Sequence, residues 1–164
     1  MRTPLATLAL ASVGLLVALP SVESKERPCR PWVPHGDLKD IPFHYDCSKT
    51  KGDIGVARTD GIYWCTAAEA KVEQRFPGAS HFYFVHEYGH YVKGTDEIAT
   101  DCWAAEQLAG TCTIDAVYVH LMAYADDACG THGTCRDRAR RLRACAEAAE
   151  AAQSKGAAKG KAKK

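Results

Sequence analysis

The residues best suited to chemistry stand together at positions 86–90, in the order His86-Glu87-Tyr88-Gly89-His90. On a helix, histidines four residues apart lie about 40° from a common face and roughly 6 Å apart along the axis, so both imidazoles can reach one metal ion. Glu87 then points to the adjacent face, where a carboxylate can take a proton from a metal-bound water. The pattern predicts a hydrolytic metal centre, and a pair of structural histidines is the alternative.

A hydrolytic zinc site needs a third protein ligand and an open position for water. Glu97 is the candidate, because Gly94 can end the first helix and Thr95 can cap a second helix that begins at Asp96. Glu97 would then lie in the first turn of that second helix. Asp96 is the main rival ligand. The structural alternative is that Asp96 and Glu97 only complement the helix dipole.

Asp101 lies four residues after Glu97, on the same face of the expected second helix. It is placed to hydrogen-bond the free nitrogen of a ligating imidazole and so to fix the tautomer of that ring. Apolar residues at helical spacing, Val85, Tyr88 and Val92, predict that the helix carrying the histidines is buried.

These residues resemble the active-site segment of gluzincin metallopeptidases, whose pattern is HExxH followed by ExxAD. Residues 97–101 read Glu-Ile-Ala-Thr-Asp, so Thr100 stands where the family has alanine. The gap between His90 and Glu97 is short and is similar to that of small exported bacterial proteins with an HE-x-GH and E-x-x-ADCWA segment. The resemblance is strongest over residues 86–104.

The resemblance implies an exported zinc-dependent endopeptidase acting on peptides or proteins. It implies these roles: Zn²⁺ ligands His86, His90 and Glu97, general base Glu87, and orienting carboxylate Asp101. Three alternatives stay open, namely a non-catalytic disulfide-rich zinc-binding protein, a cell-wall peptide hydrolase, and a latent enzyme whose residues 25–50 block the cleft.

A weaker match lies downstream, where Thr131-His132 is followed by Arg138 and Leu142. This resembles the THPP…R…L segment of the prenyl-protein endopeptidase branch of gluzincins, with a Gly-Thr pair in place of both prolines. The resemblance implies that His132 assists the tetrahedral intermediate and that Arg138 orders the substrate site, and donors aimed at an oxyanion are a large catalytic term. The alternative is a loop histidine followed by a solvated basic helix.

Residues 1–24 have the composition of a signal peptide. Arg2 provides a charged start, residues 5–19 form an apolar run without charge, and small residues precede position 25. That run of about 15 residues is short for a bilayer span. We therefore expect export to the periplasm or the extracellular space, with no stable membrane insertion after cleavage.

All eight cysteines lie beyond the expected signal peptide, at positions 29, 47, 65, 102, 112, 129, 135 and 145. An even count in an exported chain predicts disulfides, whereas the absence of a CxxC pair argues against a cysteine zinc site. One pairing is excluded, because Cys135 and Cys145 on a single helix would be about 15 Å apart. A bridge from Cys102 would fix the helix that carries Glu97.

Charge is uneven along the chain, although the net charge is +1. Residues 25–154 carry 15 basic and 19 acidic residues, and five lysines follow Ser154. Residues 153–164 are therefore expected to form a disordered Lys-rich tail. A functional alternative is that this tail is weakly attracted to anionic surfaces. No aromatic residue interleaves with these lysines, so no nucleic-acid partner is expected. The arginines of residues 136–143 are interpreted as a solvated helix face.

The expected fold is α+β and helix-dominated, a minimal zincin-like core with a short sheet and about four to five helices, stapled by disulfides. Residues 25–50 would form an irregular Pro/Gly-rich arm and residues 51–152 the metallopeptidase domain. Trp103 and Tyr124 are expected to fill the core. Strands are expected at residues 54–58 and 61–65, with the second as the open edge for an extended peptide. Helices are expected at residues 66–76 (opened by a Thr66/Glu69 capping box), 80–93, 96–109, 114–125 and about 135–152.

Overall fold

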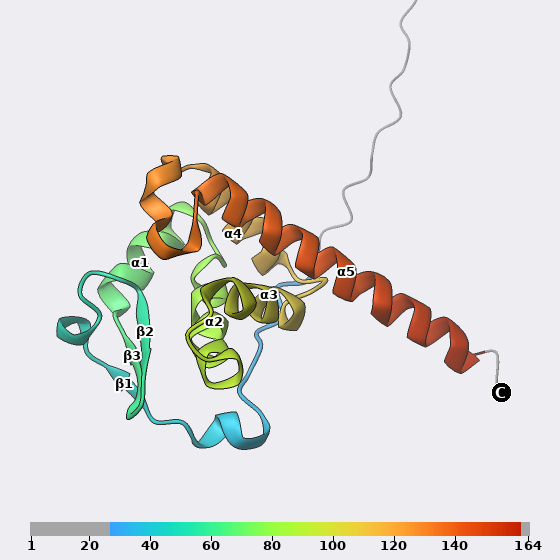
Figure 1. The fold of residues 1–164 in the computed structure, drawn as a ribbon, viewed down its shortest axis with the longest axis horizontal. Coiled ribbons are helices and arrows are strands. Elements are labelled where there is room, and N and C mark those ends of the chain that lie inside the picture. The colour runs from blue at the N-terminus through green and yellow to red at the C-terminus, as the bar shows by residue number, and fades with distance from the viewer. Residues whose placement is uncertain (1–26, 162–164) are drawn as a thin grey trace, which may run out of the picture.

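The computed structural model describes residues 27–161, so the expected signal peptide lies outside the described residues. Within the described part, no helix is long and apolar enough to cross a membrane. The fold is α+β and helix-dominated, with one small sheet and four disulfides, as the sequence predicts. The sheet stands on one side of helix α2, and helices α3, α4 and α5 stand on the other (Figure 1).

The elements lie close to their predicted positions. In chain order they are η1 (Gly36–Asp40), β1 (Phe43–Tyr45), η2 (Cys47–Lys49), β2 (Gly55–Arg58), β3 (Gly61–Trp64), α1 (Thr66–Arg75), α2 (Ser80–Lys93), α3 (Glu97–Gln107), α4 (Cys112–Met122), η3 (Asp126–His132) and α5 (Cys135–Lys161). Segments η1, η2 and η3 are 3₁₀ helices.

The sheet has the strand order β1-β3-β2, with β1 parallel and β2 antiparallel to β3. The arm of residues 25–50 is therefore not wholly irregular, because its Phe43–Tyr45 segment pairs with β3. This pairing makes β3 the central strand. The expectation that Gly61–Cys65 is the open edge is wrong, and the edge that faces α2 is β2.

Helices α2 and α3 approach each other closely at Gly89. A Cβ at this position would stand 2.8 Å from Thr100 Cγ2 and 3.0 Å from Trp103 Cε3. Only glycine therefore allows this distance between the helices. Gly94, at φ +73°, ends α2, as predicted.

The cap of α3 is Asp96 and not Thr95. The carboxylate oxygen Oδ1 of Asp96 accepts the backbone N–H groups of Ile98 and Ala99, both at 3.0 Å. An aspartate is among the best N-cap residues, and this one satisfies two otherwise unpaired donors. Helix α3 consequently begins at Glu97, and Asp96 is occupied as a cap rather than free to act as a ligand.

The hydrophobic core lies between α2, α3, α4 and the first half of α5. Its buried members are Phe82, Val85, Ala104, Ala105, Leu108, Ile114, Val117, Leu121, Ala139, Leu142 and Ala146. Trp103 packs against this core as predicted. The second half of α5 projects beyond it and continues to Lys161 (Figure 1). The expected disordered tail is thus helical up to that residue, because alanine and lysine are strong helix formers.

Four disulfides connect the described part of the chain, three of them across 18 to 83 residues and one across 6. They are Cys29–Cys112, Cys47–Cys65, Cys102–Cys145 and Cys129–Cys135. Cys135 and Cys145 both lie on α5 and each has another partner, in agreement with the excluded pairing. The bridge from Cys102 fixes α3 to α5, as expected for a covalent support of the helix that carries Glu97.

The expected capping box at the start of α1 does not form. The N-cap of α1 is Cys65, and it makes no side-chain cap hydrogen bond. The carboxylate oxygen Oε2 of Glu69 accepts the indole N–H of Trp64 at 2.9 Å instead. Glu69 is therefore directed toward the aromatic side chains of the sheet.

We predict that Gly89→Ala destabilises the fold by about 1–3 kcal/mol, because the added methyl group forces α2 away from α3. Urea denaturation followed by circular dichroism measures this loss. Gly156→Ala is the matched control, since a Cβ on this α5 glycine meets no atom within 4 Å. Equal stability of the two variants would contradict the close packing at Gly89.

Candidate metal centre

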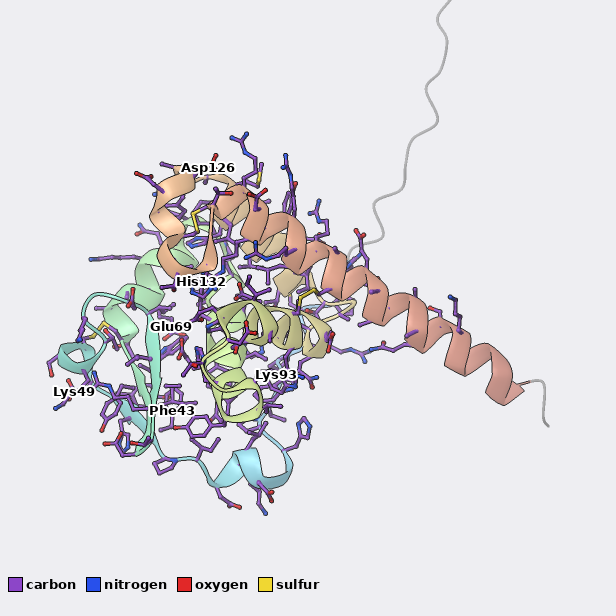
Figure 2. All side chains as sticks on the ribbon, viewed as in Figure 1. Phe43, Lys49, Glu69, Lys93, Asp126 and His132 are labelled. Atoms are coloured by element: carbon purple, nitrogen blue, oxygen red, sulfur yellow. A yellow bond between two sulfur atoms is a disulfide. The ribbon has the colours of Figure 1, made fainter. Side chains whose placement is uncertain are left out.

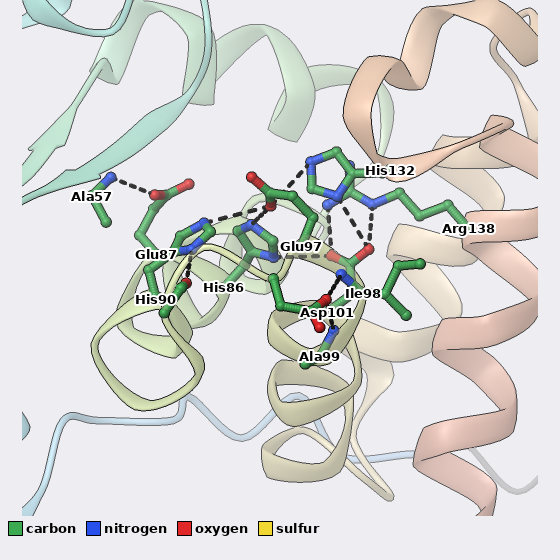
Figure 3. A network of polar contacts seen from close by, with 12 residues as sticks. Ala57, His86, Glu87, His90, Glu97, Ile98, Ala99, Asp101, His132 and Arg138 are labelled. Carbon is green, nitrogen blue, oxygen red and sulfur yellow. Dashed lines mark hydrogen bonds and ion pairs between the residues drawn. The ribbon is translucent and has the colours of Figure 1, made fainter.

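The two histidines of the His-Glu-x-x-His segment face one carboxylate oxygen. The Nε2 atoms of His86 and His90 lie 3.2 Å and 3.5 Å from Oε2 of Glu97 (Figure 3). The two imidazole rings come from successive turns of α2, and their centroids are 4.8 Å apart. Glu97 reaches them from the first turn of α3, where the break at Gly94 and the cap at Asp96 place it.

His86, His90 and Glu97 form a group that could hold a metal ion, since their ligand atoms lie within 4.8 Å of one another. Two ligands about 2.0–2.1 Å from one tetrahedral ion are about 3.4 Å apart, which matches the two distances to Glu97 Oε2. That oxygen is buried and makes no hydrogen bond with the described residues. When the neighbouring Nε2 atoms carry no proton, this buried acceptor has no donor, which is costly, so a cation fits between these side chains.

A second group of potential ligands contains His86, Asp101 and His132. Both carboxylate oxygens of Asp101 are already bound by Arg138, at 2.9 Å from Nε and 2.8 Å from Nη2. This guanidinium would repel a divalent cation placed beside Asp101. The group that contains Glu97 is therefore the better metal site.

Asp101 is almost fully buried, with 1% of its side chain exposed, and lies beside two imidazoles. Its Oδ1 is 2.9 Å from Nδ1 of His86, and its Oδ2 is 3.3 Å from Nδ1 of His132. Burial alone would raise the pKa of Asp101, but the two histidines and Arg138 lower it well below its usual range. The anionic carboxylate favours a proton on each Nδ1, which leaves the Nε2 atoms free to bind a metal.

His90 has a different orienting group, which the sequence did not reveal. Its Nδ1 lies 2.8 Å from the backbone carbonyl oxygen of Gly94 and is placed to donate to it. The residue that ends α2 therefore also fixes the tautomer of the second histidine. Glu97 has its pKa lowered, first by its contact with His86 and further by the other two imidazoles, so it is an anion at neutral pH.

Glu87 lies beside the cluster formed by His86, His90 and Glu97, and 7% of its surface is exposed. Its Oε2 accepts the backbone N–H of Ala57 in β2 at 2.6 Å, which fixes the carboxylate toward the open edge of the sheet. Burial raises its pKa above the ordinary value, although His86 and His90 oppose this. Gly55 leaves the room that Glu87 needs, because a Cβ there would stand 2.8 Å from Glu87 Cγ.

His132 reaches the same cluster from η3. Its Nε2 is 3.5 Å from Glu97 Oε2, yet it is not part of the mutually close group formed by the other three residues. Arg141 donates to the backbone carbonyl of His132 at 2.6 Å, and the Cys129–Cys135 disulfide closes the loop that bears it. The structure thus brings all the expected site residues together, and His132 stands to one side of the three candidate ligands (Figure 3).

Arg138 is buried, with 6% of its surface exposed, so the expectation of a fully solvated arginine face on α5 is wrong for this residue. Its guanidinium is held in place by Asp101 and lies 5.7 Å from the ring centroid of Tyr83. Its partner is a buried carboxylate on another helix, and helical periodicity does not reveal such a pairing.

A cavity of about 820 Å³ opens over the cluster. One wall is formed by β2 and the other by η3 and the end of α4. The sequence did not identify His120 and Tyr83 as residues that line the cavity. Tyr124 was expected in the core, but it also lines the cavity. Burial lowers the pKa of His120 to about 4, so this imidazole is neutral. No motif marks these residues, and only the tertiary fold brings them to the site.

The N-terminal arm does not close this cavity. None of its described residues, 27–50, lines the walls. Trp32 packs instead on the opposite side of α2, with its ring centroid 5.4 Å from that of Tyr88. The alternative of a latent enzyme blocked by residues 25–50 therefore has no support from the described residues.

No protein-family model, curated protein or solved structure matches this chain. The resemblance to gluzincins accordingly rests on the motif residues and their spacing.

We predict that Glu97→Ala lowers zinc affinity by at least about 100-fold, because it removes a charged ligand. Competition with a chromophoric chelator measures the affinity, and mass spectrometry counts the bound metal. Asp96→Ala is the matched control, since it should cost about 1 kcal/mol of helix capping but keep the metal. Loss of zinc affinity in Asp96→Ala, with unchanged affinity in Glu97→Ala, would make Asp96 the ligand.

Metal affinity should rise with pH. Burial alone would lower the pKa of His86, but Asp101 and Glu97 outweigh it and raise the pKa to about 9 in the metal-free chain. The ion must therefore displace a proton from His86, and affinity should rise about tenfold per pH unit up to about pH 9. Chelator competition from pH 6 upward, corrected for the protonation of the chelator, measures this slope. A flat profile would contradict a proton at His86.

Proposed function

We propose that this chain is an exported zinc-dependent endopeptidase. The observation that carries the proposal is the grouping of His86, His90 and Glu97 beside a buried Glu87, on the wall of an open cavity. Two imidazoles and one carboxylate are a ligand set of hydrolytic zinc enzymes. The likeness of residues 86–104 to the gluzincin segment supports the same reaction.

Zinc bound by these three residues would supply Lewis acidity and would lower the pKa of a coordinated water to about 7. The remaining chemistry falls to protein side chains. Glu87 is positioned to accept a proton from water attacking a peptide carbonyl and to deliver it to the leaving amine. Its raised pKa suits both steps, because a catalytic acid–base group works best when its pKa is near the working pH.

His132 is the candidate donor to the oxyanion that forms on the peptide carbonyl. Its Nε2 faces the cluster, and the carboxylate of Asp101 lies 3.3 Å from its Nδ1. In its imidazolium form this ring has an Nε2–H that can donate to the negative oxygen while its Nδ1–H faces Asp101. Arg138 acts through Asp101, which it holds with two hydrogen bonds.

An extended peptide substrate would bind along the free edge of β2. Among residues 27–161 its single strand partner is β3, and its other edge faces the cavity beside Glu87. Backbone pairing with such an edge depends little on side chains and would admit many sequences. The four disulfides agree with an oxidising compartment, which supports export of the protein.

We predict that Glu87→Gln keeps the metal and loses cleavage by about 10²–10⁴-fold, because the amide cannot accept the proton. Hydrolysis of labelled denatured casein measures activity, and purified peptidoglycan tests the cell-wall alternative. Glu106→Gln, an exposed change on α3, is the control and should cleave like the unaltered protein. Equal activity of Glu87→Gln would exclude this base, and zinc binding without cleavage by the unaltered protein would favour a non-catalytic role.

A further inference from the structure

A second cavity, of about 230 Å³, lies on the opposite face of α2 from the metal cluster. We call it the aromatic pocket. It is built by the arm, β1, β3, α1 and α2, and its lining residues are Trp32, Phe43, Tyr45, Trp64, Glu69, Ser80, His81 and Phe84. Two of its residues, Phe43 and Glu69, are labelled in Figure 2 beside the sheet.

The walls of the aromatic pocket are mostly rings. The centroid of Phe43 is 5.3 Å from Tyr45, 6.1 Å from Trp64 and 5.5 Å from Phe84. Tyr45 forms the rim, with 74% of its surface exposed. Aromatic rings carry negative charge on their faces, and a ring face directed into a cavity attracts a cation with apolar substituents.

Glu69 is the charged residue of the pocket. It is held there because its Oε2 accepts the Trp64 indole N–H. No described lysine, arginine or histidine forms an ion pair with Glu69. His81 accepts the backbone N–H of Trp32 through Nε2, and burial lowers its pKa, so this imidazole is neutral. The pocket therefore has one negative charge without a positive partner.

We propose that the aromatic pocket binds a quaternary ammonium group, of the size and chemistry of a choline headgroup. The ring walls suit the methyl groups, and Glu69 balances the charge. A bare ammonium ion would lose more hydration on entering the pocket, and a neutral group of the same shape would leave Glu69 without a counterion. The group comes from a free small molecule or from a lipid headgroup. This site is independent of the proposed peptidase activity.

Tetramethylammonium chloride is the first probe, because it has no lone pair and does not coordinate zinc at the other cavity. Two of the three tryptophans, Trp32 and Trp64, line the aromatic pocket, so fluorescence reports binding. The full mature chain with its disulfides intact should show a saturable emission change. Neopentyl alcohol, a neutral molecule of similar shape, should give none. No saturation with tetramethylammonium, or an equal response to the alcohol, would overturn the proposal.

Glu69→Gln tests the charge, since the amide oxygen can still accept the Trp64 N–H and preserve the fold. It should weaken tetramethylammonium binding at least about fivefold, whereas Glu106→Gln should leave it unchanged. Tyr45→Leu, on the exposed rim, tests the rings without disturbing the core and should also weaken binding. Unchanged affinity in both Glu69→Gln and Tyr45→Leu would overturn the assignment.

A further comparison separates the two sources of the ligand. Free choline should compete with tetramethylammonium if the source is a small molecule. Sedimentation of the protein with phosphatidylcholine vesicles, at a salt concentration that abolishes binding of its Lys-rich tail to phosphatidylglycerol vesicles, would assign the headgroup of a lipid. Absence of both choline competition and vesicle binding would exclude the choline-type ligand.

Discussion

The carboxylate of Asp101 carries a full charge in a place almost closed to water, and it is stable there because side chains from three other elements, α2, η3 and α5, contact it. Arg138 of α5 binds both of its oxygens, and the Nδ1 atoms of His86 and His132 lie beside them. A buried charge without such partners would be costly. This one interaction fixes α3 against α5 and turns two imidazoles so that their Nε2 atoms face Glu97. The candidate metal site depends on it.

The local part of the site could be predicted from the sequence, because helix periodicity and capping operate over a few residues. Spacing places His86 and His90 on one face, and Gly94 predicts the helix break that lets Glu97 return to them. The helix-dominated α+β fold and the presence of disulfides could also be predicted. The cap was assigned one residue too early, since Thr95 and Asp96 are both good cap residues and only the structure distinguishes them.

The remainder depends on contacts between residues far apart in the chain. Nothing local shows that Phe43–Tyr45 pairs with β3 and so changes which strand is the open edge. The same holds for Arg138, whose neighbours on α5 suggest an exposed face, and for His120, which reaches the cavity through the packing of α4. Glu69 fits a capping-box pattern, but the nearby Trp64 offers its indole N–H as a competing donor.

The covalent links have a consequence for the order in which the centre is assembled. His86 and His90 share one helix and need no bridge to meet. His132, by contrast, lies in the small ring closed by Cys129 and Cys135, and the Cys102–Cys145 bond secures α3 to the same helix that ends this ring. A chain with reduced thiols lacks both tethers, so formation of these two disulfides restricts the loop that bears His132 and the helix that bears Glu97, and oxidising conditions favour the assembled site.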